Sequence, residues 1–111
     1  MWNMLKDEFD TCKVRAWFEM LEANASGWST PVKSGLRPNH NFWGPDNRDM
    51  CMGQIELIDD GQILPGEKKQ VIINFLGLSE FISKLEVGFR WRIQAGSQYF
   101  ANGEVIEIIE N

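Results

Sequence analysis

The sequence has little of the residue types that would mark a metalloprotein or a disulfide scaffold. It contains one histidine and two cysteines, and Cys12 and Cys51 do not form a CxxC motif. A reduced, buried cysteine pair is therefore favoured over a disulfide or a metal site. Asp59 and Asp60 lie in a segment, IDDG, that lacks the rest of a calcium-binding loop, so it indicates a solvated turn. We expect no metal and no cofactor.

Long apolar runs are also absent. No segment approaches the roughly 20 apolar residues of a membrane span, and the N-terminus, MWNMLKDEFD, has neither the basic start nor the apolar core of a secretory signal. These absences predict a cytoplasmic protein with no membrane partner. A chain of 111 residues is long enough for one domain with a single core.

Positive charge is scarce, because 11 Lys and Arg face 16 Asp and Glu and the formal net charge is −5. Such a chain repels phosphate backbones on average, so nucleic-acid binding would need a local basic stripe. The closest approach to one is Lys68 and Lys69 together with Arg90 and Arg92, the last two of which alternation places on one face of a strand. An ordinary solvated sheet face is the favoured interpretation.

The usual signatures of catalysis are missing too. His40 is the only histidine, and no Ser or Cys is spaced around it as in a recognised nucleophile motif. A lone histidine is more often structural. Nothing selects a catalytic carboxylate pair among the acidic residues, and no GxxxxGK[ST] loop occurs, so neither catalysis nor nucleotide binding is expected.

What the chain does have is the alternation of apolar and polar residues that is typical of half-buried strands. Six segments carry it: residues 12–21, 37–43, 50–57, 68–75, 87–93 and 99–109. In the first, Val14, Ala16 and Phe18 fall on one side. Residues 79–86 could be helical but are few, so a turn or a single helical turn is equally open. A turn rich in Gly, Ser and Pro follows the first segment, and Gly103 in the last segment indicates a bulge or a close backbone approach. This pattern predicts an all-β sandwich or closed barrel, and closure is favoured because it leaves no exposed edges.

Several motifs, in order along the chain, resemble the third domain of elongation factor Tu. The segment TPVKSGLRP is similar to the family's TPFFKGYRP, GQIEL to GTVEL, and GFRWRIQAGSQYFANGEV to GLRFAIREGGRTVGAGVV. The resemblance covers about residues 12–109, with one insertion around GPDNRDM. It implies a closed six-stranded antiparallel barrel over residues 12–111, preceded by an N-terminal extension of residues 1–11 that we expect to dock on the barrel.

The resemblance also bears on RNA. Arg37 matches the arginine of GYRP, which in the family lies near the T-stem of bound tRNA, although a structural role for Arg37 is equally open. Other matching positions have changed: Trp28 replaces an arginine and Met52 a threonine. The residues that could still contact RNA are Arg37, Asn39, Arg90, Arg92 and Gly96. Because phosphate contacts supply most non-specific affinity, so small a set predicts poor tRNA binding.

Tryptophan stands at three positions where the family has charged residues. Trp17, Trp28 and Trp43 are the candidate partner-binding residues, because tryptophan is enriched among interface hot spots. An alternative stays open, in which residues 1–11 wrap over these rings and extend the core.

Two functions follow as expectations. The first is a non-catalytic binding module that acts through protein contacts as a mimic or decoy of the elongation factor domain, or as a toxin-immunity protein. The second is a small translation-associated RNA-binding or tRNA-binding factor. A fragment of a divergent GTPase is disfavoured because the chain has its own Met1.

Overall fold

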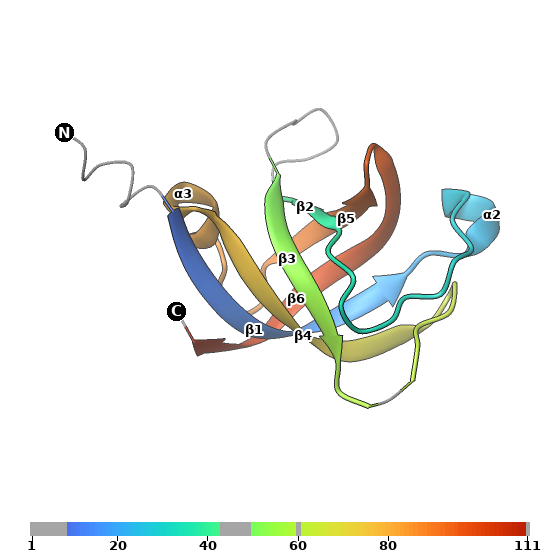
Figure 1. Ribbon diagram of the computed structural model, residues 1–111, viewed down its shortest axis with the longest axis horizontal. Coiled ribbons are helices and arrows are strands. Elements are labelled where there is room, and N and C mark those ends of the chain that lie inside the picture. Colours follow the sequence, from blue (N-terminus) through green and yellow to red (C-terminus); the bar gives the residue numbers. More distant parts are fainter. Residues whose placement is uncertain (1–8, 43–49, 60, 111) are drawn as a thin grey trace.

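The computed structural model describes residues 9–42, 50–59 and 61–110, and it is an all-β protein with two very short helices (Figure 1). The strands are β1 (Phe9–Met20), β2 (Asn39–Asn41), β3 (Cys51–Leu57), β4 (Lys68–Leu78), β5 (Arg90–Ala95) and β6 (Gln98–Glu110). The helices are α2 (Ala23–Ser26) and α3 (Ser79–Ile82). No helix within these described ranges is long and apolar enough to cross a membrane.

The strands close into a barrel in the order β1-β4-β3-β2-β5-β6, and each neighbouring pair is antiparallel. The predicted closed six-stranded antiparallel barrel is therefore confirmed. Strand β1 begins at Phe9, so residues 9–11, which were assigned to the N-terminal extension, belong to the barrel. Residues 1–8 lie outside the described part of the chain, and so does the expected docking of the extension. Helix α3 confirms the single helical turn expected within residues 79–86, whereas α2 forms where only a turn was predicted.

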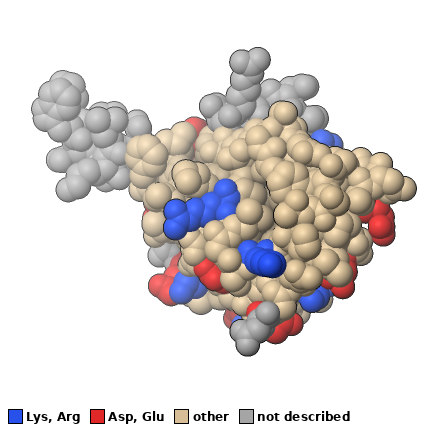
Figure 2. Space-filling model, turned by 45° about the vertical axis from the view of Figure 1, so that its right-hand side comes forward, with Lys and Arg blue, Asp and Glu red and all other residues tan. Residues whose placement is uncertain are grey.

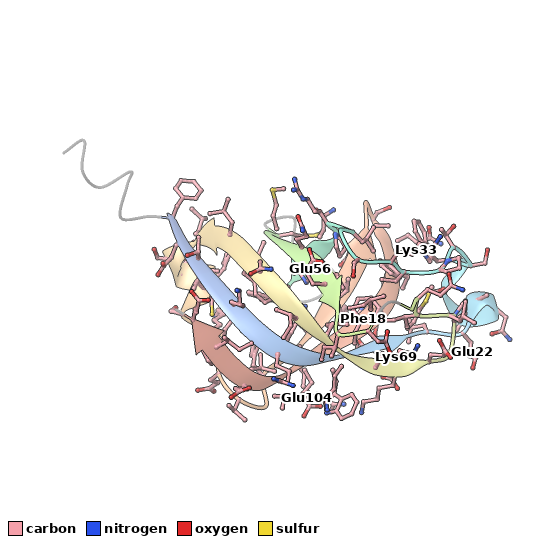
Figure 3. The ribbon with its side chains drawn as sticks, turned by 60° about the horizontal axis from the view of Figure 1, so that its bottom comes forward. Phe18, Glu22, Lys33, Glu56, Lys69 and Glu104 are labelled. Carbon is pink, nitrogen blue, oxygen red and sulfur yellow. The ribbon has the colours of Figure 1, made fainter. Side chains whose placement is uncertain are left out.

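Alternation along the strands decides which side chains fill the barrel. Val14, Ala16 and Phe18 are fully buried, as the sequence predicted. Figure 3 shows Phe18 inside the barrel and Glu104 on its outside, as expected for strands of which one face is buried and the other solvated. Cys12 and Cys51 are both free and buried, which confirms the predicted reduced pair.

Close packing explains two of the glycines. A Cβ built on Gly103 would lie 2.3 Å from Cζ2 of Trp91, and one built on Gly53 would lie 2.7 Å from Nε2 of His40. Neither distance is possible between real atoms, so larger residues at these positions would displace the neighbouring ring. The sequence predicted a bulge or a close backbone approach at Gly103, and the structure shows the close approach.

A buried histidine ties three strands together from the inside. The indole Nε1 of Trp91 donates a hydrogen bond to Nδ1 of His40 at 3.0 Å, and Nε2 of His40 lies 3.0 Å from the Gly53 carbonyl oxygen. Since an indole N–H can only donate, Nδ1 carries no proton and Nε2 is the donor to Gly53. Burial lowers the pKa of His40 to about 4, although the bond to Gly53 acts in the opposite direction. His40 is therefore a neutral structural residue that joins β2, β3 and β5.

Candidate functional site

Three large apolar side chains lie together on the outside of the barrel. Phe9 is 56% exposed, Met52 55% and Leu76 52%. Met52 and Leu76 are direct cross-strand partners on β3 and β4, and Phe9 is paired with Leu78 two residues further along β4. Because side chains two residues apart share one face of a strand, all three project from the same side. We call Phe9, Met52 and Leu76 the Met52 face.

The surface around this face is hollowed on both sides of Met52 and Leu76. A groove of about 380 Å³ runs toward the start of β1 and is lined by Phe9, Met50, Met52, Leu76, Gly77, Leu78 and Phe81. A second groove of about 440 Å³ runs in the other direction and is lined by Arg37, Met52, Gly53, Gln54, Asn74 and Leu76. Met52 and Leu76 thus separate a groove lined by apolar residues from one whose lining also includes Arg37, Gln54 and Asn74.

Among the residues that the structure describes, Arg37 supplies the only charge that lines either groove. It is exposed, and its Nε donates a hydrogen bond to Oε1 of Gln54 at 2.7 Å. Gln54 in turn donates to Glu56. No carboxylate forms an ion pair with Arg37 in the described part of the chain, where Lys13, Arg15 and Arg90 take the three ion pairs. The remaining guanidinium N–H groups of Arg37 are left to solvent or a ligand.

Contacts inside the barrel fix the part of β3 that carries Met52. The carbonyl of Gly53, the residue after Met52, accepts the hydrogen bond of His40. Cys51, the residue before Met52, packs so tightly on β4 that a Cβ at Gly77 would lie 2.6 Å from its Sγ atom. Both residues next to Met52 in the sequence are therefore held by contacts inside the barrel, and these contacts fix the position of Met52 on the outer face of β3.

The predicted partner-binding tryptophans do not form this surface. Trp28 is half-buried: its ring stacks on Phe100 with centroids 5.1 Å apart, and its Nε1 donates to the Thr30 carbonyl at 3.0 Å. Trp17 projects outward from β1, as predicted, but it is also half-buried, and Nζ of Lys68 lies 5.1 Å from its ring centroid. The structure does not bring the two together, and Trp43 lies outside the described residues.

The predicted RNA-contacting arginines are also dispersed. Arg90 and Arg92 share the outer face of β5, as alternation predicted. Arg90 is bonded to Glu104 at 3.4 Å, and Cζ of Arg92 lies 4.5 Å from the ring centroid of Tyr99. Arg37 turns instead toward Gln54 on β3.

The two remaining RNA candidates lie on β2 and in the turn that follows β5. Asn39 is paired with Gln94 and with Met52, and Gly96 forms the turn between β5 and β6 with φ of 62°. Figure 2 shows the side of the molecule that carries α2 and this turn, and most of that surface bears no charged side chain. The sequence agrees, because residues 23–32 and 93–103 contain no Lys, Arg, Asp or Glu. The candidates therefore do not assemble into a basic stripe.

A larger hollow lies elsewhere and carries few reactive groups. It measures about 710 Å³ and is lined by Lys33, Ser34, Leu57, Ile58, Asp59, Gly61 and Gln62. The Ser34 hydroxyl accepts a hydrogen bond from the Leu57 backbone N–H at 2.8 Å. Across residues 9–42, 50–59 and 61–110, no three His, Cys, Asp or Glu side chains are grouped as metal ligands.

The sequence held a partial signal for the Met52 face. Met52 was noted as an apolar replacement at a position where the resemblance implies threonine, and Leu76 follows the inward Phe75, so alternation places Leu76 outside. Their proximity depends on the pairing of β3 with β4, which no local pattern specifies.

No protein-family model and no curated protein matches this chain.

Proposed function

We propose that this chain is a non-catalytic binding module that acts through protein contacts, and that the Met52 face is its contact surface. The observation that carries the proposal is the juxtaposition of Phe9, Met52 and Leu76, each more than half exposed, on three neighbouring strands. Contiguous apolar surface bounded by polar residues marks protein-interaction sites. Methionine suits such a site because its flexible, polarisable side chain adapts to the partner.

The polar groups of the barrel support binding over catalysis. Both ring nitrogens of His40 are engaged inside the core, and the ring is 0% exposed. Within residues 9–42, 50–59 and 61–110, the two grooves beside Met52 are lined by one ionisable side chain, that of Arg37. General acid–base or nucleophilic chemistry needs at least two convergent groups in hydrogen-bond reach of each other and of a substrate.

The resemblance to the third domain of elongation factor Tu suggests which class of protein the chain would bind. A chain with such a barrel would act as a mimic or decoy that occupies a protein normally bound by the elongation factor, or as an immunity protein against a toxin. These versions rest on the resemblance alone, because a barrel fold by itself does not specify a function.

The alternative is a small translation-associated RNA-binding factor, which the exposed Arg37 would favour. The pairing of Arg90 with Glu104 weakens it, because a neutralised arginine adds little to phosphate binding. A true tRNA complex would weaken steeply as salt is raised, whereas an apolar contact would not.

The experiment is an affinity purification from cell extract, with and without nuclease treatment, using the wild-type chain and a Met52→Ser, Leu76→Ser double variant. Serine removes apolar surface without adding charge, and both residues are exposed, so the fold is expected to survive. The matched control is an Ile58→Ser, Val87→Ser double variant, whose parent residues are 55% and 69% exposed and lie outside the Met52 face.

We expect the wild type and the control to retain the same protein, and the Met52 face variant to lose it. Equal recovery by both double variants would refute the assignment of the surface. Recovery that disappears on nuclease treatment would favour the RNA-binding alternative.

A further inference from the structure

We infer that the segment bound at the Met52 face carries an acidic side chain next to its apolar anchor, and that this carboxylate pairs with Arg37. This inference rests on the proposed function and adds the chemistry of the partner. The anchor occupies the apolar groove that includes Phe9 and Met50, and the carboxylate reaches the groove that Arg37 lines.

The geometry of Arg37 leaves it ready for a second partner. Its Nε is bonded to Gln54, a neutral side chain that turns the guanidinium toward β3 without neutralising it. Gln54 also donates to Glu56, so the amide connects the arginine to a carboxylate one residue further along the same face. The terminal N–H groups of Arg37 remain as a planar pair of donors, the arrangement that binds a carboxylate through two parallel hydrogen bonds.

A second cation near this surface is already paired with a carboxylate. Lys13 lies beside the neighbouring hollow on β1, and its Nζ is 3.2 Å from the Glu110 carboxylate. Arg37 is therefore the cationic side chain of this surface that has no ionic partner within the described residues. The chain as a whole is acidic, but charges farther away than about 8 Å are screened at physiological salt, so the local arginine dominates for a docked side chain.

The same surface suits a peptide better than RNA. Two of the three exposed side chains of the Met52 face, Met52 and Leu76, are aliphatic, and Phe9 is its one exposed aromatic ring, whereas single-stranded RNA is held by several flat aromatic rings on which successive bases stack. One unpaired arginine neutralises one phosphate, which gives little affinity, because RNA binding grows with the number of phosphates contacted. A peptide with a carboxylate next to an apolar side chain would contact both Arg37 and the apolar side chains that line the two grooves.

The test is selection of random peptides displayed on phage against the immobilised full chain, followed by affinity measurement with synthetic copies of the enriched peptides. We expect the enriched peptides to combine an aliphatic or aromatic residue with Asp or Glu. Their binding is expected to weaken about tenfold in an Arg37→Gln variant, the usual scale for loss of one charge-assisted pair at an interface. An Arg15→Gln variant is the control, because Arg15 is already paired with Glu107 on another part of the barrel.

Charge reversal makes the assignment specific. An Arg37→Glu variant should recover affinity for a peptide in which the acidic residue is replaced by Lys.

Enriched peptides without acidic residues, or equal affinity for wild type and Arg37→Gln, would overturn the inference while leaving the proposed function standing. If no peptide is enriched, or if the Met52→Ser, Leu76→Ser variant binds the enriched peptides as tightly as the wild type does, both the inference and the proposed function fail. Binding of a random RNA 30-mer that is lost in Arg37→Gln would assign Arg37 to phosphate and overturn the carboxylate assignment.

Discussion

Acidification from about pH 7 to about pH 5 is expected to destabilise this barrel through His40, before most carboxylates begin to titrate. In the folded chain Nδ1 of His40 accepts the Trp91 indole hydrogen bond and Nε2 donates to Gly53. A protonated ring cannot accept the indole N–H and would place a charge in a fully buried site. The unfolded chain takes up the proton without either cost.

The size of the effect follows from the lowered pKa. Burial moves the pKa of His40 from 6.5 to about 4. Since the folded pKa lies below the unfolded one, the contribution of neutral His40 is complete above pH 6.5 and is lost as the pH falls toward 4. Each pH unit in this window costs about 1.4 kcal/mol, so about 2 kcal/mol is lost by pH 5 and about 3 kcal/mol in all.

The assay is the free energy of unfolding from urea titrations at the two pH values, for wild type and for a His40→Gln variant. Glutamine keeps a donor and an acceptor but does not titrate in this range, so the variant is expected to show only the small loss due to carboxylates. The chain has one histidine, which makes its NMR titration unambiguous. A ring that titrates near its ordinary value, or equal pH dependence in the two proteins, would refute the reasoning.

Three further predictions concern packing and exposure. Gly103→Ala places a methyl group 2.3 Å from Cζ2 of Trp91, so urea titration should show a loss of about 1–3 kcal/mol, and unchanged stability would contradict the close approach. Trp28→Ser removes a half-buried ring stacked on Phe100, so we expect the free energy of unfolding to fall by about 2 kcal/mol. The folded fraction should still capture the partner as the wild type does. A variant that keeps full stability but no longer captures the partner would show that Trp28 belongs to the contact surface. Burial, and secondarily the neighbouring thiol of Cys12, raises the pKa of Cys51 to about 12, so a disulfide reagent at pH 8 should label it only after denaturation, and rapid labelling of the native protein would be inconsistent with its burial.

The period of the strands could be predicted from the sequence because it is a local property. Alternation around Val14 and Phe18 identified the inward face of β1, and the same reasoning placed Arg90 and Arg92 together on the outside of β5. The close approach at Gly103 followed from a glycine inside a strand pattern. Barrel closure could be favoured because a small sheet of this kind would otherwise expose two edges.

The surface could not be predicted in the same way, because it depends on which strands lie side by side. Trp28 interrupts a polar segment and looks exposed in the sequence, yet it packs on Phe100 from the distant β6. Trp17 alternates outward, but Lys68 from the neighbouring strand covers it. Conversely, Met52 and Leu76 are ordinary outward residues until β3 and β4 pair and place them opposite each other.

Placement of a photocrosslinking amino acid, p-benzoylphenylalanine, on the outside of the barrel in intact cells tests the role of the Met52 face most directly. One version carries it at Met52, and the other carries it at Val87, which is more exposed than Met52 but lies beside β6. A single crosslinked protein from position 52, absent from position 87, is the expected result. The same products at both positions, or no protein crosslink from Met52, would contradict a contact surface on β3 and β4.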